Sequence, residues 1–499
     1  MIFPGIRDIA AALDRGDYSV RELTEQCLSD ARTANERLNC LITIADERAL
    51  AQADAIDRAR ARGDTGTLAG VPLVHKDIYC TEGLPTTCAS RMLANFTAPY
   101  SATVVERLDA AGMVTFAKAN LDEFAMGSSN ENSHFGAVAN PWDTDRVPGG
   151  SSGGSAASVA AGLTPVATGT DTGGSIRQPA SFCGISGIKP TYGRVSRYGM
   201  IAFASSLDQG GVLARDVEDL ALVLGAMAGY DERDSTSSSH DDAWLEGVSH
   251  TGVGMPDRSL TIGLPLEYFE HHTGSVALVD AAKATLEAAG ARFVDVSLPN
   301  TAAAIPAYYI IAGAEASTNL SRYDGVRFGY RCENTDSIEE LYERSRSEAF
   351  GAEVKRRILT GTYALSVGYY DAYYLKAQKI RRLIQNDFLR AFESVDLLLT
   401  PTTPGVAFRR GELTGDPVAM YQQDVYTTPA SLAGLPAMSL PCGMHERLPV
   451  GMQLIGPHFA ERALLQAGAL YQRETDWHSL TPDIGEHPSA DSPVQKEES

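Results

Sequence analysis

The chain has 499 residues, of which 44% are hydrophobic and 21% are charged, a composition that excludes wholesale disorder and collagen-like repeats. Its formal net charge of −21 repels phosphate backbones, so we do not expect the chain to hold DNA or RNA by itself. Seven scattered cysteines without a CxxC pair support neither a zinc site nor a redox dithiol. The charged N-terminal residues and the lack of a long apolar run predict neither a signal peptide nor a membrane span, which favours a cytoplasmic protein.

Helical and strand-like segments alternate along most of the chain. Ser19 and Glu22 form a candidate capping box at the start of a helix. Further helices are predicted over residues 46–62, 104–112, 155–162 and 276–289. Short apolar runs predict strands over residues 71–78, 113–118, 163–169, 261–265, 292–299, 395–401, 437–441 and 450–456. This alternation predicts an α/β fold with helices on both faces of a sheet.

Few composition changes mark a domain boundary. We expect a single domain over residues 1–481, with a helical N-terminal part over about 1–65. The polar stretch 231–242 is interpreted as an exposed loop rather than a linker. Residues 482–499 are polar and contain prolines, which predicts a disordered tail.

Two clusters of glycine and serine, at 149–155 and 172–175, flank a predicted helix–strand unit. A single cluster of this kind is usually only a turn, but two clusters around an almost uncharged unit favour a functional site. Clustered glycines let a backbone approach a ligand closely. Ser175 would begin the next helix, whose positive end favours an oxyanion. The backbone N–H groups that could turn toward the same point belong to Thr172, Gly173 and Gly174.

Residues 150–154 also fit the GxSxG nucleophile elbow, with Ser152 at its centre. That elbow must follow a strand directly, whereas residues 140–149 are turn-like. None of the ten histidines lies in an evident catalytic context. An elbow-type esterase is therefore disfavoured, and it differs from the other hypotheses in requiring Ser152.

A lysine can activate a serine only when its amine is neutral, so its pKa must fall from about 10.4 through burial or neighbouring positive charge. Lys76 is favoured because it lies near the end of the apolar run 71–78. Lys118 also ends a strand-like run, but the acids that follow it could keep it charged. An ordinary ion pair between Lys76 and Asp77 is the alternative.

Lys76, the GGSSGGS cluster and the segment GTDTGGSIRQPA together resemble the amidase signature family, whose catalytic device is a Ser-cisSer-Lys triad. The separations of 24 residues between Ser151 and Ser175 and of 75 residues between Lys76 and Ser151 agree with that family. The resemblance implies that Ser175 is the nucleophile, that Ser151 is a bridging serine in a cis peptide and that Lys76 is the base. It also implies that the amides of residues 172–175 hold the oxyanion, and that the fold is a large mixed β-sheet covered by helices on both faces.

Four segments outside the triad resemble, within this family, the glutamine-hydrolysing subunits of tRNA-dependent amidotransferases. These segments span residues 189–211, 308–329, 353–374 and 421–443. By that resemblance Arg357 binds the α-carboxylate of glutamine, whereas Asp424 and Tyr308 hold its amino end. An arginine fork fits a carboxylate and an aspartate fits an ammonium group. Arg356 and Tyr309 stay open as neighbouring alternatives.

The resemblance further implies a heterotrimer with amidotransferase subunits B and C. Ammonia would pass to a partner that uses ATP and Mg²⁺ to amidate Glu-tRNA(Gln), Asp-tRNA(Asn) or both, and that partner would hold most of the charged tRNA. For the chain itself we expect no metal, no cofactor, no DNA and no membrane, since it has no GxxxxGK[ST] loop, metal-ligand cluster or basic patch. A stand-alone amidase of small or aryl amides, the elbow-type esterase and a non-catalytic scaffold stay as alternatives.

Overall fold

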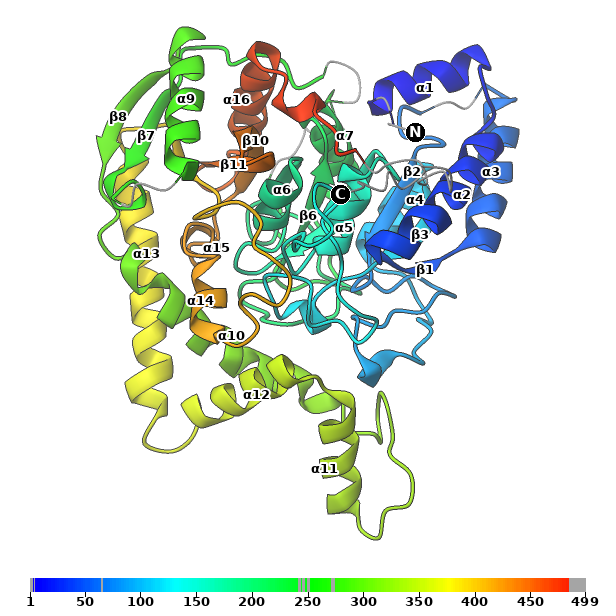
Figure 1. The fold of residues 1–499 in the computed structure, drawn as a ribbon, viewed down its shortest axis with the longest axis vertical. Helices are drawn as coiled ribbons and strands as arrows, with labels where there is room; N and C mark the ends of the chain where they lie inside the picture. Colours follow the sequence, from blue (N-terminus) through cyan, green and yellow to red (C-terminus); the bar gives the residue numbers. More distant parts are fainter. Residues whose placement is uncertain are drawn as a thin grey trace, which may run out of the picture.

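The computed structural model describes residues 3, 5–63, 66–240, 244, 247, 248, 252–270 and 274–483 (Figure 1). It contains one mixed sheet of 11 strands, covered by helices, which confirms the predicted fold class. In the order in which they pair, the strands are β1 (Leu41–Ile44), β3 (Val114–Ala119), β2 (Pro72–Lys76), β4 (Val166–Asp171), β6 (Gln209–Ala214), β5 (Ser186–Lys189), β10 (Ala437–His445), β11 (Leu448–Ile455), β9 (Leu397–Pro401), β7 (Thr261–Pro265) and β8 (Arg292–Val296).

The sheet combines parallel and antiparallel pairs. Strand β2 is parallel to both β3 and β4, and β7 is parallel to both β8 and β9. The pairs between these two groups, from β4 through β6, β5, β10 and β11 to β9, are antiparallel. The strands predicted from short apolar runs are present, although β10 continues four residues beyond its predicted end.

The helices are α1 (Ile6–Arg15), α2 (Val20–Leu38), α3 (Asp46–Arg60), α4 (Thr103–Ala110), α5 (Gly153–Ala160), α6 (Arg177–Cys183), α7 (Val217–Met227), α9 (Gly274–Ala288), α10 (Ala304–Asn319), α11 (Ile338–Ala349), α12 (Ala352–Ala364), α13 (Lys376–Ala391), α14 (Pro417–Gln422), α15 (Thr428–Leu432) and α16 (Glu461–Glu474). The predicted capping box is formed at α2: the Glu22 N–H donates to Ser19 Oγ at 3.1 Å, and the Ser19 N–H donates to Glu22 Oε2 at 2.8 Å.

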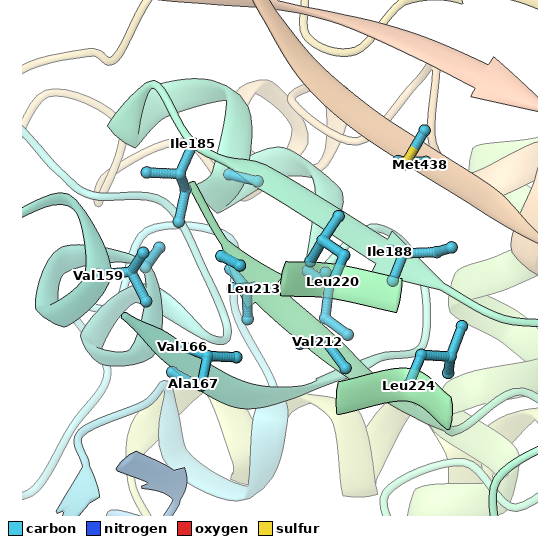
Figure 2. Packing of buried hydrophobic residues seen from close by; sticks show 14 of the residues in the cluster. Val159, Val166, Ala167, Ile185, Ile188, Val212, Leu213, Leu220, Leu224 and Met438 are labelled. Carbon is cyan, nitrogen blue, oxygen red and sulfur yellow. The ribbon is translucent and has the colours of Figure 1, made fainter. Parts of the chain in front are cut away.

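The central strands are buried on both faces. Figure 2 shows Val166 of β4, Val212 of β6 and Ile188 of β5 packed among Val159 of α5 and Leu220 of α7. The glycine at position 154 lets α5 come close to the residue that follows β3, since a Cβ there would overlap the backbone carbonyl of Asn120. The small residues of α5 thus allow the preceding segment, which contains Ser151 and Ser152, to lie beside the ends of β2 and β4.

Several predictions of local structure were incomplete. The N-terminal part is not wholly helical, because β1 interrupts it and pairs with β3. The stretch predicted as an exposed loop has buried anchors: Asp231 accepts a hydrogen bond from Ser196 at 2.7 Å, and Asp234 accepts one from the Arg197 N–H at 2.9 Å. Its residues 241 and 242, and residues 484–499 of the predicted tail, lie outside the described residues. The single domain over 1–481 stays a prediction.

Across the described residues, no helix is both long enough and apolar enough to span a membrane.

Candidate active site

The side chain of Lys76 is wholly buried at the end of β2 and faces three hydroxyl groups. Its Nζ lies 2.8 Å from Ser151 Oγ, 2.9 Å from Ser152 Oγ and 2.8 Å from Thr170 Oγ1. Burial lowers the pKa of Lys76 to about 7, although nearby carboxylates, that of Asp122 foremost, act in the opposite direction. A large share of the amine is therefore neutral near pH 7.

The expected alternative, an ion pair between Lys76 and Asp77, does not form. Asp77 instead pairs with Lys118, whose Nζ lies 2.9 Å from Asp77 Oδ1. Burial also lowers the pKa of Lys189 to about 7, but its Nζ donates to the backbone carbonyls of Pro190 and Leu435. Of these three buried lysines, Lys76 is the one whose amine contacts serine hydroxyls.

The hydrogen bonds of Ser152 restrict those of the Lys76 amine. Ser152 Oγ donates to the Thr170 carbonyl at 3.2 Å, so its oxygen accepts from Lys76. A neutral amine has two hydrogens and one lone pair. With one hydrogen directed to Ser152 and the other to Thr170, the lone pair is left for the Ser151 hydroxyl. This arrangement lets Lys76 take a proton from Ser151.

The peptide bond between Gly150 and Ser151 is cis, as the family resemblance implies. A Cβ on residue 150 would overlap the Asp122 carboxylate, so only glycine fits there. The Gly150 N–H donates to Gln178 Oε1 at 2.9 Å, and the Ser151 carbonyl accepts from the Asp122 N–H at 3.2 Å. Both sides of the bridging serine's backbone are thereby fixed.

Ser175 lies in the turn between β4 and α6. The prediction that it begins the helix was wrong by two residues, because α6 begins at Arg177. The Ser175 carbonyl accepts from the Ser152 N–H at 3.2 Å, which ties the two glycine–serine clusters together. Within the described residues the Ser175 hydroxyl makes no hydrogen bond. Lys76 and Ser151 are therefore hydrogen-bonded to each other, whereas Ser175 is not hydrogen-bonded to Ser151.

The loop over residues 172–175 offers free backbone donors. Among the described residues, none of its four N–H groups donates a hydrogen bond to the protein. The Gly173 carbonyl, by contrast, accepts from the hydroxyls of Thr427, at 2.7 Å, and Thr428, at 3.2 Å. Gly174 has φ of 152°, and a Cβ there would overlap Thr427. The carbonyls thus point into the protein, which leaves N–H groups for an oxyanion.

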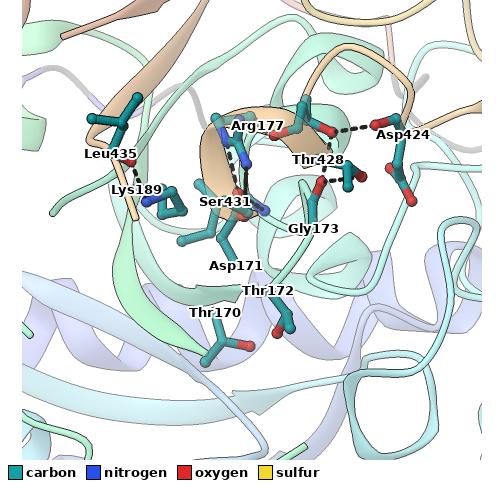
Figure 3. Close-up of polar contacts among 12 residues, drawn as sticks. Thr170, Asp171, Thr172, Gly173, Arg177, Lys189, Asp424, Thr428, Ser431 and Leu435 are labelled. Atoms are coloured by element: carbon teal, nitrogen blue, oxygen red, sulfur yellow. Dashed lines mark hydrogen bonds and ion pairs between the residues drawn. The ribbon is translucent and has the colours of Figure 1, made fainter. Parts of the chain in front are cut away.

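A buried ion pair closes this loop at its base (Figure 3). Arg177 Nε and Nη2 donate to the two carboxylate oxygens of Asp171, each at 2.9 Å. Arg177 also donates to the Thr427 carbonyl at 2.9 Å. Its contact with Ser431 Oγ, at 2.7 Å, is drawn in Figure 3. Burial acts to raise the pKa of Asp171, but the Arg177 guanidinium holds it below its usual range. The sequence analysis missed this pair, although Asp171 and Arg177 are isolated charges in an almost uncharged segment.

Arg357 projects from α12 with its guanidinium only partly used. Its Nε donates to Glu353 Oε1 at 2.8 Å, and its Cζ lies 4.8 Å from the centre of the Tyr309 ring. Its two terminal nitrogens make no hydrogen bond to the described part of the chain. Arg356 is 47% exposed and pairs with Glu353, which favours Arg357 as the binding residue. A cavity of about 130 Å³ opens beside Arg357 and Tyr421.

Tyr308 and Asp424 lie against the loop over residues 172–175, which we call the oxyanion loop. A Cβ on Gly173 would lie 2.8 Å from the Tyr308 ring, whereas Tyr309 stacks on Tyr421 with 3.7 Å between ring centres. Asp424 Oδ2 accepts from the Ser128 hydroxyl, and Oδ1 is buried without a partner among the described residues. Burial raises the pKa of Asp424 to about 7. An unpaired buried carboxylate oxygen is suited to a ligand ammonium group.

Known proteins share this sequence and this architecture. The family model described as Amidase matches residues 22–465. The chain belongs to the amidase family. Over 480 residues it is 59% identical to the A subunit of the glutamyl-tRNA(Gln) amidotransferase of Alkalilimnicola ehrlichii, covering 96% of this amidase and 98% of that protein. The corresponding protein of Pseudomonas aeruginosa is 58% identical over 481 residues, with 96% and 98% covered.

Two solved structures extend the comparison. The crystal structure of the glutamyl-tRNA(Gln) amidotransferase A subunit from Thermotoga maritima matches with a TM-score of 0.76 and 39% identity, covering 94% of this amidase and 96% of that chain. The peptide amidase PAM, in complex with the competitive inhibitor chymostatin, matches with a TM-score of 0.76 and 30% identity, covering 94% and 97%.

Among the described residues, no group of three or more His, Cys, Asp or Glu side chains could hold a metal ion.

Replacing Arg177 with Met should destabilise the amidase strongly, because the Asp171 carboxylate would stay buried without its partner. We expect a loss of about 3–5 kcal/mol in the free energy of unfolding, measured by denaturant titration. The control is Arg473→Met, which breaks a surface ion pair with Glu474 and should cost about 0–1 kcal/mol. A loss below about 1 kcal/mol for Arg177→Met would contradict the role given to the buried pair.

Proposed function

We propose that this amidase is the glutaminase subunit of a tRNA-dependent amidotransferase. It hydrolyses glutamine and supplies ammonia for converting Glu-tRNA(Gln) to Gln-tRNA(Gln), Asp-tRNA(Asn) to Asn-tRNA(Asn), or both. The observation that carries the proposal is a combination of two features. Lys76 and Ser151 are joined by a hydrogen bond of 2.8 Å, and the terminal nitrogens of Arg357 and Oδ1 of Asp424 have no hydrogen-bond partner among the described residues. The names of the relatives that are 58–59% identical support the same function.

In the acylation step, Ser175 Oγ attacks the side-chain amide carbon of glutamine. Its proton passes to Ser151, and the proton of Ser151 passes to the neutral amine of Lys76. The Ser175 hydroxyl is not tied to another group of the described chain, so its side chain is free to turn toward Ser151 and close the relay. The free N–H groups of residues 172–175 stabilise the oxyanion, and one such donor is typically worth about 2.7–4 kcal/mol.

The tetrahedral intermediate collapses when the C–N bond breaks. The proton held by Lys76 returns through Ser151 to the leaving nitrogen, so that ammonia departs and an ester to Ser175 remains. Water then attacks this ester, with Lys76 and Ser151 accepting its proton. The bond to Ser175 breaks, the serine recovers its proton and glutamate is released. The balance needs no metal and no redox group in this chain.

Recognition of glutamine as a free amino acid uses the second half of the site. The terminal nitrogens of Arg357 pair with the α-carboxylate, and Glu353 holds the guanidinium by its Nε. Asp424 Oδ1 pairs with the α-ammonium group, and Tyr308 lies beside it against the oxyanion loop. A bound ammonium favours the ionised form of Asp424, whose pKa burial has raised.

The remaining steps belong to partners. We propose a cytoplasmic heterotrimer with amidotransferase subunits B and C, in which a partner binds ATP and Mg²⁺ and holds most of the tRNA. A stand-alone amidase acting on small or aryl amides is the second candidate, favoured by the structural similarity to the peptide amidase PAM. The two candidates share the triad and differ in what the second half of the site binds.

The test of the proposed function is a comparison of the chain alone with the chain co-expressed with its B and C subunits. We expect the complex to form Gln-tRNA(Gln) or Asn-tRNA(Asn) from the mischarged tRNA with glutamine and ATP. We expect Ser175→Ala to abolish glutamine-dependent product while leaving product formed from added ammonia. Rapid turnover of aryl amides by the chain alone, with no product from the complex, would favour the stand-alone amidase.

Substitution of the triad should separate this mechanism from the esterase elbow. We expect Ser175→Ala, Ser151→Ala and Lys76→Met each to lower kcat for glutamine by a factor on the order of 10³, because each breaks the proton relay. Ser152→Ala removes an acceptor of the Lys76 amine and the hydrogen bonds of Ser152 Oγ with the Thr170 backbone but leaves the relay groups in place, so a loss on the order of tenfold is expected. Release of glutamate is the measurement. An inactive Ser152→Ala variant together with an active Ser175→Ala variant would contradict the assignment of Ser175 as nucleophile.

The pH dependence should follow the neutral fraction of Lys76. Its pKa is lowered to about 7, so the fraction of free base rises with pH. We therefore expect kcat/KM to increase through pH 7 and to fall about tenfold per pH unit well below it. The measurement uses glutaric acid monoamide with the Asp424→Asn variant, because the carboxyl group of Asp424 also has a pKa of about 7 and would titrate in the same range. A rate that keeps rising to about pH 10, near the ordinary pKa of lysine, would contradict a neutral Lys76.

A further inference from the structure

We propose that Gln178 is a positioning residue that couples binding of the substrate's α-ammonium group at Asp424 to the placement of Ser151. The inference rests on the proposed function, because it takes an amino-acid amide as substrate. It adds to that function a route by which recognition of the amino end raises the rate of the chemical step.

Gln178 is wholly buried in α6, shortly after the oxyanion loop. Its backbone N–H donates to the Gly174 carbonyl at 2.8 Å. Its side-chain Nε2 donates to the Ser128 carbonyl at 2.7 Å, and its Oε1 accepts from the Gly150 N–H at 2.9 Å. An amide offers a donor and an acceptor at once, whereas a methionine of similar length offers neither. The side chain therefore adds a polar link between the Ser128 and Gly150 segments, which also pack against each other, since a Cβ on Gly150 would lie 2.8 Å from the Ser129 backbone nitrogen.

The first segment contains Ser128, which is hydrogen-bonded to the carboxylate of Asp424. The Ser128 hydroxyl donates to Asp424 Oδ2, and its carbonyl accepts from Gln178. Asp424 Oδ1 is buried and has no partner among the described residues. A cation bound at Oδ1 thus acts on a carboxylate whose other oxygen already holds Ser128.

The second segment carries the bridging serine. Gly150 precedes Ser151, whose Oγ lies 2.8 Å from Lys76 Nζ. The backbone is tightly packed on the Cα side of both glycines, because a Cβ on Gly149 would overlap Gln178 Oε1 and a Cβ on Gly150 would overlap Asp122. With so little room there, a shift of Gln178 is expected to move Gly150 and, through it, Ser151.

The empty and occupied states differ in the charge of Asp424. Burial raises the pKa of this carboxyl group to about 7, so part of it is protonated near neutral pH when the site is empty. A bound ammonium group ionises it fully, and an ionised carboxylate accepts a stronger hydrogen bond from Ser128. The series of hydrogen bonds from Asp424 through Ser128 and Gln178 to Gly150 then favours a single arrangement. The expected consequence lies in kcat, beyond any effect on binding.

The experiment compares L-glutamine with glutaric acid monoamide, which keeps the carboxylate and the amide but lacks the α-ammonium group. For the native chain we expect kcat for glutamine to exceed kcat for the monoamide by about tenfold or more. In Gln178→Met, kcat for glutamine should fall until this ratio approaches one, while kcat for the monoamide falls by less than about threefold. A purely structural role would lower both values equally, and that outcome, or a change in KM alone, would overturn the inference.

A double-mutant cycle gives an independent reading. Asp424→Asn and Gln178→Met should each lower kcat for glutamine, and the double variant should be no slower than the slower single variant, because both interrupt one chain. Additive losses would overturn the inference. The matched control is Gln466→Met. Gln466 lies in α16 and donates to the Met255 carbonyl, and its replacement should leave both kcat values unchanged.

Gln178→Glu serves if the methionine variant does not fold. It keeps the acceptor for Gly150 and loses the donor to Ser128, so the same collapse of the kcat ratio is expected, and an unchanged ratio would overturn the inference. Failure of the proposed function is distinguishable, since it would appear as a native chain that does not hydrolyse glutamine. A native chain that hydrolyses glutamine and the monoamide with equal kcat would overturn the coupling alone.

Discussion

The site depends on an amine that is buried among hydroxyl groups instead of beside a carboxylate. Lys76 is enclosed by Ser151, Ser152 and Thr170, at 2.8–2.9 Å from its Nζ. The adjacent acid, Asp77, is occupied by Lys118. If Asp77 paired with Lys76, the attraction would hold the amine in its charged form, and a charged amine cannot accept a proton. The Lys118–Asp77 pair therefore supports the proposed base by occupying the carboxylate next to Lys76.

The second constraint is that a glycine-rich loop must be rigid to act as an oxyanion site. Glycines make close approach possible but do not hold a conformation. Here the bidentate Asp171–Arg177 pair closes the loop, and the hydroxyls of Thr427 and Thr428 hold the Gly173 carbonyl. These contacts direct the carbonyls inward, so the N–H groups are left for the substrate. Preorganised donors of this kind cost no rearrangement during the reaction.

Much of the fold could be predicted from local sequence, because apolar runs and caps act over a few residues. The capping box at Ser19 and the strand ending at Lys76 are examples. Lys76 and Ser175 were candidates from local sequence, but Ser151 and the connection among the three residues came from family resemblance, since 75 residues separate Lys76 from Ser151 and no local pattern joins them. Strand β1 was missed because a strand of only four residues between two helices gives a weak signal.

Contacts between distant segments account for the rest of what the sequence analysis missed. Arg177 meets the Thr427 carbonyl across 250 residues of sequence, and Ser128 meets Asp424 across 296. Gln178 gave no signal either, since a glutamine early in a helix is ordinary until its two partners are known. The proposal of Arg357 rather than Arg356 as the carboxylate ligand likewise gains from the structure, because burial distinguishes the two adjacent arginines.

The most direct test of the account is the titration of Lys76 itself. The chain has eight lysines, few enough for their side chains to be followed by NMR after selective ¹³Cε labelling, with the Lys76→Met variant assigning the resonance. The account predicts a midpoint near pH 7, in line with the lowered pKa of the buried amine. A midpoint near the ordinary lysine value of about 10.4 would show a charged amine at neutral pH and would contradict the proposed base.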